Sequence, residues 1–211
     1  MLFGAILLQT VPAADLVAKM KDVSSYQYRV TAIAGKDKRI YQGEYADATL
    51  HTVTPEAEYA ISKTKRLTQP KGGEWEQLPR LRARAIHAPH EWVAQLAALS
   101  PNLKKVRSDK VQGVTVDVWV YDLETAVAQK AMAISGLPGM AELLGLSDGT
   151  KTKNGLLYYV GRADKLVYRV ELRADAEVNQ APVQKIVTLD FTMFNRAKLI
   201  LPPKVLEMLG R

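Results

Sequence analysis

The sequence contains no cysteine. This absence excludes disulfide bonds, thiolate metal sites, a cysteine nucleophile and a lipid anchor attached through an N-terminal cysteine. Histidine is also scarce, since the chain has only His51, His87 and His90. His87 and His90 are three residues apart, but Pro89 between them favours a helix that begins after His87, so helical spacing does not bring the two imidazoles together. The sequence therefore gives no support to a metal site.

Recognisable catalytic motifs are absent as well. No serine lies in a Gly-x-Ser-x-Gly arrangement, and no glycine-rich loop resembles a phosphate cradle. Gly136 and Gly139 flank a proline in an apolar segment, which is not a phosphate-binding pattern. We therefore expect neither enzymatic activity nor a cofactor.

Long hydrophobic runs are confined to the start of the chain. Residues 1–8 are apolar and residues 9–14 end in small side chains, which resembles the end of a secretory signal although a positively charged start is missing. We expect residues 1–13 to be a signal-peptide remnant, with a buried first turn or strand as the alternative, and residues 14–211 to form a single domain. No other stretch approaches the ~20 apolar residues of a membrane span. The mature protein is thus expected to be soluble and exported, for example to the periplasm.

Positive charge is in excess, with 29 Lys and Arg against 22 Asp and Glu and a net charge of +7 over 211 residues. Basic side chains cluster at residues 63–66, 80–84 and 104–107. Such clusters attract anionic membrane surfaces or acidic proteins, although a solvated face is the simpler interpretation. Nucleic acid is not an expected partner, because the aromatic residues lie mostly on apolar faces and are not interleaved with the basic ones.

Period-two alternation predicts most of the strands. Residues 25–34, 166–173 and 183–194 each place apolar side chains at alternate positions, which gives a strand one apolar and one polar face. This pattern is typical of an antiparallel sheet that is covered on one side. We expect one long strand over residues 39–54, another over residues 58–68, and further hairpins around Gly113 and near Asp164.

Helical spacing predicts the cover of this sheet. Helices are expected over residues 14–23 and 89–99, and residues 124–146 favour two short apolar helices interrupted by Gly-Leu-Pro-Gly at 136–139. The fold class is therefore α+β. An ordinary packed core is the simplest outcome, but two helices joined by such a break can also leave a cavity or open a groove.

Three segments resemble the LolA-like superfamily, which holds periplasmic lipoprotein carriers, mycobacterial lipid-binding lipoproteins and envelope sensor domains. They are DLVAKM (15–20) running into SYQY (25–28), the hairpin LYYV (157–160) with LVYRVE (166–171), and the ending VTLDF (187–191) with FN (194–195). The resemblance implies a strongly curved antiparallel half-barrel whose concave face is closed by helices over a hydrophobic cavity for acyl chains. It implies no catalysis. The missing cysteine argues against the lipid-anchored members.

The apolar faces of the expected strands and helices indicate which residues would line such a cavity. The expected wall consists of Tyr28, Val30, Val118, Val120, Leu189 and Phe191. The expected lid consists of Trp92, Leu96, Leu137, Met140, Leu143 and Leu144. Our first hypothesis is an exported carrier or binder of lipid or lipidated protein, driven by acyl burial at about 0.8 kcal/mol per CH₂. The alternative is a cell-envelope protein-interaction or sensor domain on the same fold without a bound ligand.

Overall fold

The structure is built around one open β-sheet. This computed structural model describes residues 10–78, 86–134, 137, 153–178 and 181–211. Its strands follow the order β1-β8-β9-β10-β11-β12-β2-β3-β4-β5-β6-β7, and each neighbouring pair is antiparallel. The sheet is not closed, because β1 and β7 lie at its two edges. The strands are β1 (Thr10–Pro12), β2 (Ser25–Ala34), β3 (Asp37–Ala46), β4 (Thr49–Val53), β5 (Ala57–Ile61), β6 (Arg66–Pro70), β7 (Glu76–Gln77), β8 (Asn102–Val111), β9 (Val114–Leu123), β10 (Lys153–Gly161), β11 (Val167–Val178) and β12 (Ala181–Thr192).

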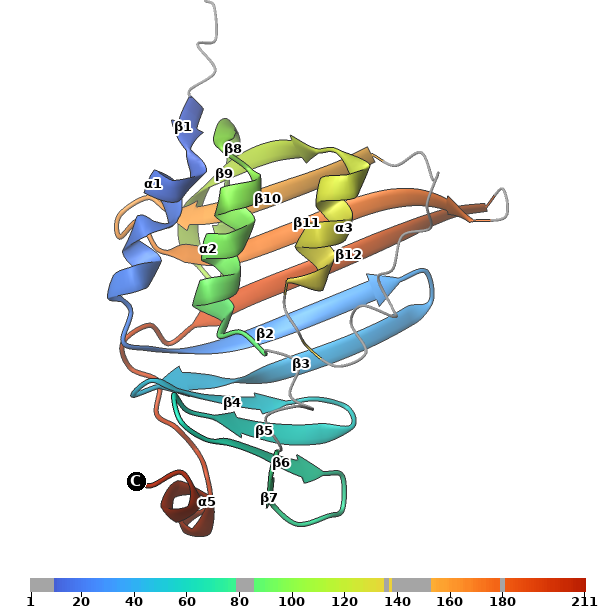
Figure 1. Cartoon of the computed structure of the whole chain (residues 1–211). Coiled ribbons are helices and arrows are strands. Elements are labelled where there is room, and N and C mark those ends of the chain that lie inside the picture. The colour runs from blue at the N-terminus through green and yellow to red at the C-terminus, as the bar shows by residue number, and fades with distance from the viewer. Residues whose placement is uncertain (1–9, 79–85, 135–136, 138–152, 179–180) are drawn as a thin grey trace, which may run out of the picture.

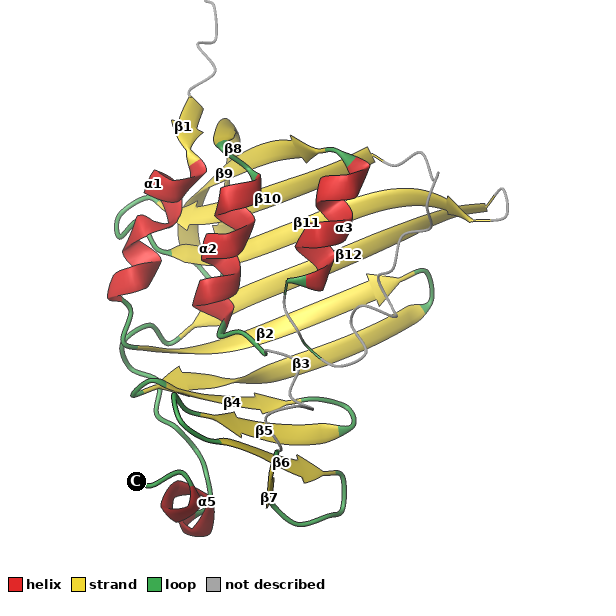
Figure 2. Cartoon of the chain, viewed as in Figure 1, coloured by secondary structure: helices red, strands yellow, loops and turns green. Residues whose placement is uncertain are grey.

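Three helices lie on one face of this sheet, with α2 between the other two (Figures 1 and 2). They are α1 (Ala13–Val17), α2 (Pro89–Leu99) and α3 (Thr125–Ala133). A 3₁₀ helix, Ala18–Asp22, continues α1, and the two together confirm the helix expected over residues 14–23. α2 has the expected bounds, since Pro89 suits a first turn in which its missing N–H is not needed. The second helix expected within residues 124–146 lies outside the described residues. The α+β class is confirmed.

The main core lies between these helices and the sheet. In β2 the alternate residues Tyr26, Tyr28 and Val30 are buried in it, as the period of two predicts. α2 adds Trp92 and Leu96 from its inward stripe. Burial of these apolar side chains, which contributes about 25 cal/mol per Å² of surface removed from water, holds the helices on the sheet.

The expectation of a single strand over residues 39–54 is wrong. β3 and β4 form a hairpin whose two-residue turn consists of Asp47 and Ala48. Their φ angles are 50° and 56°, in the left-handed region that a type I′ turn requires at both positions. Type I′ turns usually have the sequence Asn-Gly or Asp-Gly. Here alanine occupies the second position, so the sequence does not show the usual signature of such a turn.

The single strand expected over residues 58–68 is wrong for a similar reason. β5 and β6 form a second hairpin, and the Ser62 N–H donates to the Lys65 carbonyl oxygen at 2.9 Å across the turn. The turn sequence Ser-Lys-Thr-Lys contains neither glycine nor proline. By contrast, the hairpin around Gly113 and the final meander of β10, β11 and β12 are confirmed.

The C-terminal segment packs on the other face of the sheet. α5 (Pro203–Met208) lies beyond β6 and β7, away from α1, α2 and α3 (Figure 1). Cross-strand partners share a face. Leu50 belongs to the core beneath the helices, so His51 and its partner Ala60 lie on the opposite face. This second cluster consists of Ala60, Leu67, Leu201, Val205 and Leu209.

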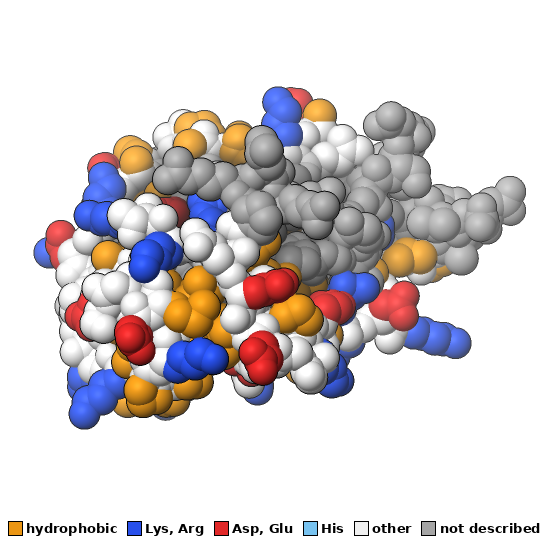
Figure 3. Space-filling model, turned by 60° about the horizontal axis from the view of Figure 1, so that its bottom comes forward, with side chains coloured by type: hydrophobic (Ala, Val, Ile, Leu, Met, Phe, Trp, Pro, Cys, Tyr) orange, Lys and Arg blue, Asp and Glu red, His pale blue; other side chains and the backbone are white. Residues whose placement is uncertain are grey.

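The surface near this end of the sheet is mixed in character. Figure 3, in which the bottom of Figure 1 comes forward, shows hydrophobic side chains interspersed with basic and acidic ones. Ile200 is 69% exposed. Isolated exposed apolar residues of this kind are ordinary and do not by themselves mark an interface.

Candidate functional site

The structure brings six of the expected site residues together beneath the helices. β2 supplies Tyr28 and Val30, β12 supplies Leu189 and Phe191, and α2 covers them with Trp92 and Leu96. All six are buried members of the main core. Their grouping follows from strand alternation on β2 and β12 and from the apolar stripe of α2.

Val118 and Val120 do not lie beneath the helices, so their expected place in the wall is wrong. Val118 pairs with Tyr159 of β10, and both belong to a third apolar cluster on the opposite face of the sheet. Val120 packs against the same cluster. Residues 118–121 of β9 are apolar in both rows, and there alternation cannot decide which row faces inward. The inward row is Trp119, Tyr121 and Leu123.

The remaining lid residues are only partly within the described chain. Leu137 is buried and belongs to the main core. Met140, Leu143 and Leu144 lie outside the described residues.

Two buried polar groups in this region differ in how they are satisfied. The Tyr26 hydroxyl lies 2.8 Å from His90 Nδ1 and accepts from the His90 backbone N–H at 3.3 Å. Burial raises the pKa of Tyr26, so this hydroxyl keeps its proton. The indole Nε1 of Trp92 is fully buried, yet it has no hydrogen-bond acceptor among the described residues. A buried donor without an acceptor costs about 1–3 kcal/mol, so this N–H calls for an explanation.

One charged residue also faces the helices. Lys185 occupies the inward row of β12, opposite Ala174, which is in the main core. It is only 8% exposed, and burial lowers the pKa of its ammonium group. The alternation had placed Lys185 in this row, but its burial could not be read from the sequence.

The histidine and acidic side chains that the structure describes are not gathered into a metal site. The described part of the chain contains no group of three His, Asp or Glu side chains arranged to hold a metal ion. His87 faces Glu91 at 3.7 Å, and His90 is engaged by Tyr26. Separately, none of the described helices is both long enough and apolar enough to cross a membrane.

Comparison with known proteins identifies the fold. No family model matches the sequence, and no curated protein matches it. The crystal structure of the lipoprotein LppX from Mycobacterium tuberculosis is similar, with a TM-score of 0.53 at 10% identity over 90% of this chain and 96% of that one. This likeness shows that the chain has the LolA-like fold. At such low identity it assigns the fold alone.

Two further solved structures align over similar lengths of this chain. LprF from Mycobacterium bovis has a TM-score of 0.46 at 10% identity, over 91% of this chain and 98% of that one. The MucA/MucB complex of Pseudomonas aeruginosa has a TM-score of 0.43 at 10% identity, over 92% of this chain and 59% of that one.

Proposed function

We propose that this protein binds a hydrophobic ligand, either a lipid or the acyl chains of a lipidated protein, between its sheet and its helices. In this proposal the sheet is a strongly curved half-barrel, α1, α2 and α3 form the cover of its concave face, and residues 14–211 act as one domain. The protein works as an exported carrier or binder, in the periplasm or an equivalent compartment, and performs no catalysis.

The observation that carries this proposal is the apolar layer beneath the helices together with the Trp92 indole. The layer is supplied by β2, β12 and α2, with Tyr28, Leu189 and Leu96 as representative members. Acyl chains entering such a layer gain about 0.8 kcal/mol per buried CH₂. An ester carbonyl on the same ligand supplies the acceptor that Trp92 Nε1 lacks among the described residues.

The second candidate is an envelope protein-interaction or sensor domain without a ligand. One observation favours it: Val30 and Phe191 are both 0% exposed, so protein atoms alone cover these two expected wall residues. A core that needs no ligand to exclude water is what such a domain requires.

Native mass spectrometry with lipid extraction tests the two candidates. The chain is exported in a bacterial host, purified without detergent and extracted with organic solvent. A lipid of one class that recurs at near-unit stoichiometry supports the carrier. A protein that carries no lipid, and takes up none from phosphatidylglycerol vesicles, overturns the carrier and supports the interaction domain.

A matched pair of variants tests the role of the indole. Trp92→Phe keeps the ring in the core and removes its N–H, whereas Trp75→Phe makes the same change in the cluster under the C-terminal segment. We expect Trp92→Phe to weaken retention of an ester lipid about 3- to 10-fold, the worth of one hydrogen bond, and Trp75→Phe to leave it unchanged. Equal retention by the two variants contradicts this role.

A further inference from the structure

A row of polar residues crosses the face of the sheet opposite the helices. In neighbouring strands Arg169 of β11 lies directly opposite Asp190 of β12, Asp190 opposite Arg29 of β2, and Arg29 opposite Gln42 of β3. Residues directly opposite one another lie about 4.5–5.5 Å apart at Cβ. Two hairpins that are distant in sequence, β2–β3 and β11–β12, therefore place two guanidinium groups on either side of one carboxylate.

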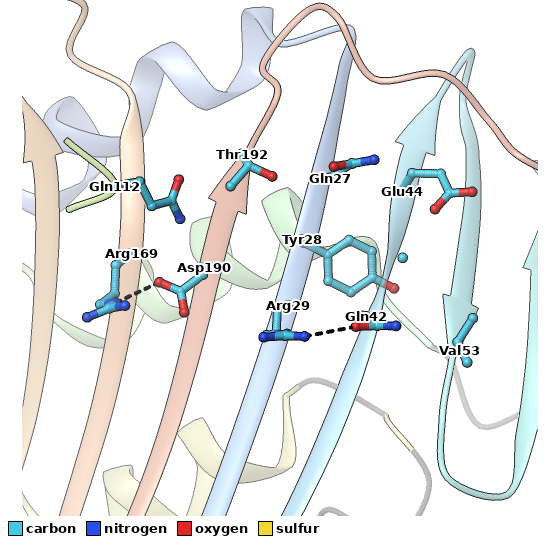
Figure 4. A pocket seen from close by; sticks show the side chains of 11 residues that line it. Gln27, Tyr28, Arg29, Gln42, Glu44, Val53, Gln112, Arg169, Asp190 and Thr192 are labelled. Atoms are coloured by element: carbon cyan, nitrogen blue, oxygen red, sulfur yellow. Dashed lines mark hydrogen bonds and ion pairs between the residues drawn. The ribbon is translucent and has the colours of Figure 1, made fainter. Parts of the chain in front are cut away.

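This row forms the floor of a pocket of about 520 Å³ (Figure 4). A volume of this size suits a small molecule. Gln27 and Thr192 lie along the pocket beside the row, and Gln112 reaches it from the turn between β8 and β9. Gln112 has a φ of 51°, a conformation that favours Gly, Asn or Asp. Together with Gly113, whose φ is 83°, it forms the two-residue turn of the β8–β9 hairpin, and this turn places the Gln112 amide at the pocket.

Among the charged side chains that line the pocket, Arg29 is bonded to a neutral partner, the Gln42 amide. Asp190 is bonded to Arg169, with 2.6 Å between Oδ1 and Nε. Glu44 is bonded to His51, with 2.9 Å between Oε1 and Nδ1, and also accepts from the Ile200 N–H. Arg29, among the described residues, donates to the Gln42 amide oxygen at 3.3 Å and forms no ion pair. The pocket therefore has a guanidinium free to bind an anion.

We propose that this pocket binds a small soluble anion whose carboxylate or phosphate-ester group pairs with Arg29. The amides of Gln27, Gln42 and Gln112 and the hydroxyl of Thr192 hydrogen-bond polar groups on the rest of the ligand. Guanidinium groups bind carboxylate and phosphate with paired, charge-assisted hydrogen bonds. The polar row lies on the face opposite α1, α2 and α3, although the pocket shares Tyr28 with the expected wall of the lipid site.

Isothermal titration and amide NMR with glycerol 3-phosphate test this proposal, with glycerol as the uncharged control. We expect a dissociation constant of about 1 mM or below at low salt, weakening as salt is added, and no binding of glycerol. NMR shifts should centre on β2, β3 and β12. Failure of glycerol 3-phosphate to bind, or shifts centred elsewhere, overturns the proposal.

Substitutions at three positions localise the binding. Arg29→Gln should weaken it about tenfold or more, Arg29→Lys should restore part of it, and Lys36→Gln, which removes the same charge from the exposed β2–β3 turn, should change it less than about twofold. Equal effects of Arg29→Gln and Lys36→Gln overturn the proposal. Gln112→Gly relieves the backbone strain and should stabilise the fold while weakening binding. Unchanged affinity in this variant also counts against the site.

A vesicle arm separates a soluble anion from a lipid headgroup. Phosphatidic acid vesicles carry the same phosphate monoester as glycerol 3-phosphate. Binding of the soluble compound that depends on Arg29, with no such dependence for vesicles, supports the proposal. Arg29-dependent binding to vesicles alone shows that the occupant is a membrane surface and overturns it.

Discussion

His51 Nδ1 lies 2.9 Å from Glu44 Oε1, and both side chains are buried. The other ring nitrogen, Nε2, lies 3.2 Å from Glu58 Oε2. Two carboxylates at the two nitrogens favour the imidazolium, which carries a proton on each. Burial alone lowers the pKa of His51, but the bonds to Glu44 and then Glu58 outweigh burial and raise the pKa above 6.5.

This raised pKa predicts a loss of stability on the alkaline side. A histidine whose pKa is higher in the folded chain contributes stability that is fully present below about pH 6.5. That contribution disappears as the pH rises through the higher folded pKa. In urea denaturation, the unfolding free energy of the wild type minus that of His51→Gln should therefore fall between slightly acidic and mildly alkaline pH.

Two other histidines control this measurement. His87→Gln is the control substitution, because the described structure places one carboxylate, Glu91, beside that ring rather than two. Burial lowers the pKa of His90, so His90 contributes with the opposite sign, losing stability as the pH falls. A difference between wild type and His51→Gln that is flat across this range would contradict a charged His51.

The close packing around Gly43 predicts that any side chain at this position destabilises the fold by steric clash. A Cβ at this position would lie 1.9 Å from the His51 carbonyl oxygen, which is backbone and cannot rotate away. We expect Gly43→Ala to lose about 3 kcal/mol or more of unfolding free energy, or to fail to fold. Gly155→Ala is the matched strand control, because its nearest neighbour is a Leu157 side-chain atom at 3.9 Å. It should change stability by less than about 1 kcal/mol.

Periodicity predicted the fold where one row of a strand was apolar and the other polar. β2 and α2 have the bounds that their patterns predict, and the inward rows of β2 and β12 were assigned correctly. Residues 118–121 of β9 are apolar in both rows, so alternation gives no reason to place Val118 rather than Trp119 toward the core beneath the helices. The Asp47-Ala48 turn was missed because its left-handed backbone is carried by a residue that rarely adopts it.

The polar pocket on the opposite face could not be predicted at all. Its floor depends on strand order, which brings β11 and β12 beside β2. Asp190 alternates with apolar neighbours along β12, but nothing local in the sequence indicates that Arg169 and Arg29 lie on either side of it. A single sequence gives the face of such a residue and leaves its cross-strand partners undetermined.

The two faces of β9 provide a direct test of the proposed lipid site. Trp119 belongs to the core beneath the helices and Val118 to the cluster on the other face. Trp119→Leu should weaken binding of a fluorescent fatty-acid probe several-fold, since it reshapes the surface that meets the acyl chain. Val118→Ala should lower stability by about 1–3 kcal/mol without changing probe affinity. The reverse pattern would place the acyl chain on the wrong side of the sheet for this proposal.

The last prediction concerns the expected cleavage after residue 13. Thr10, Val11 and Pro12 pair with β8, and Ala13 is fully buried, its N–H donating to the Pro101 carbonyl at 3.2 Å. A chain that begins at Ala14 loses these contacts and lengthens the unpaired edge of β8. It should be less stable than a chain that begins at Thr10, by about 1–3 kcal/mol in urea denaturation. We therefore expect the exported protein to retain β1, so that N-terminal peptide mass spectrometry finds a start at or before Thr10. Equal stability of the two chains would mean that β1 contributes nothing, and cleavage after residue 13 would then carry no cost.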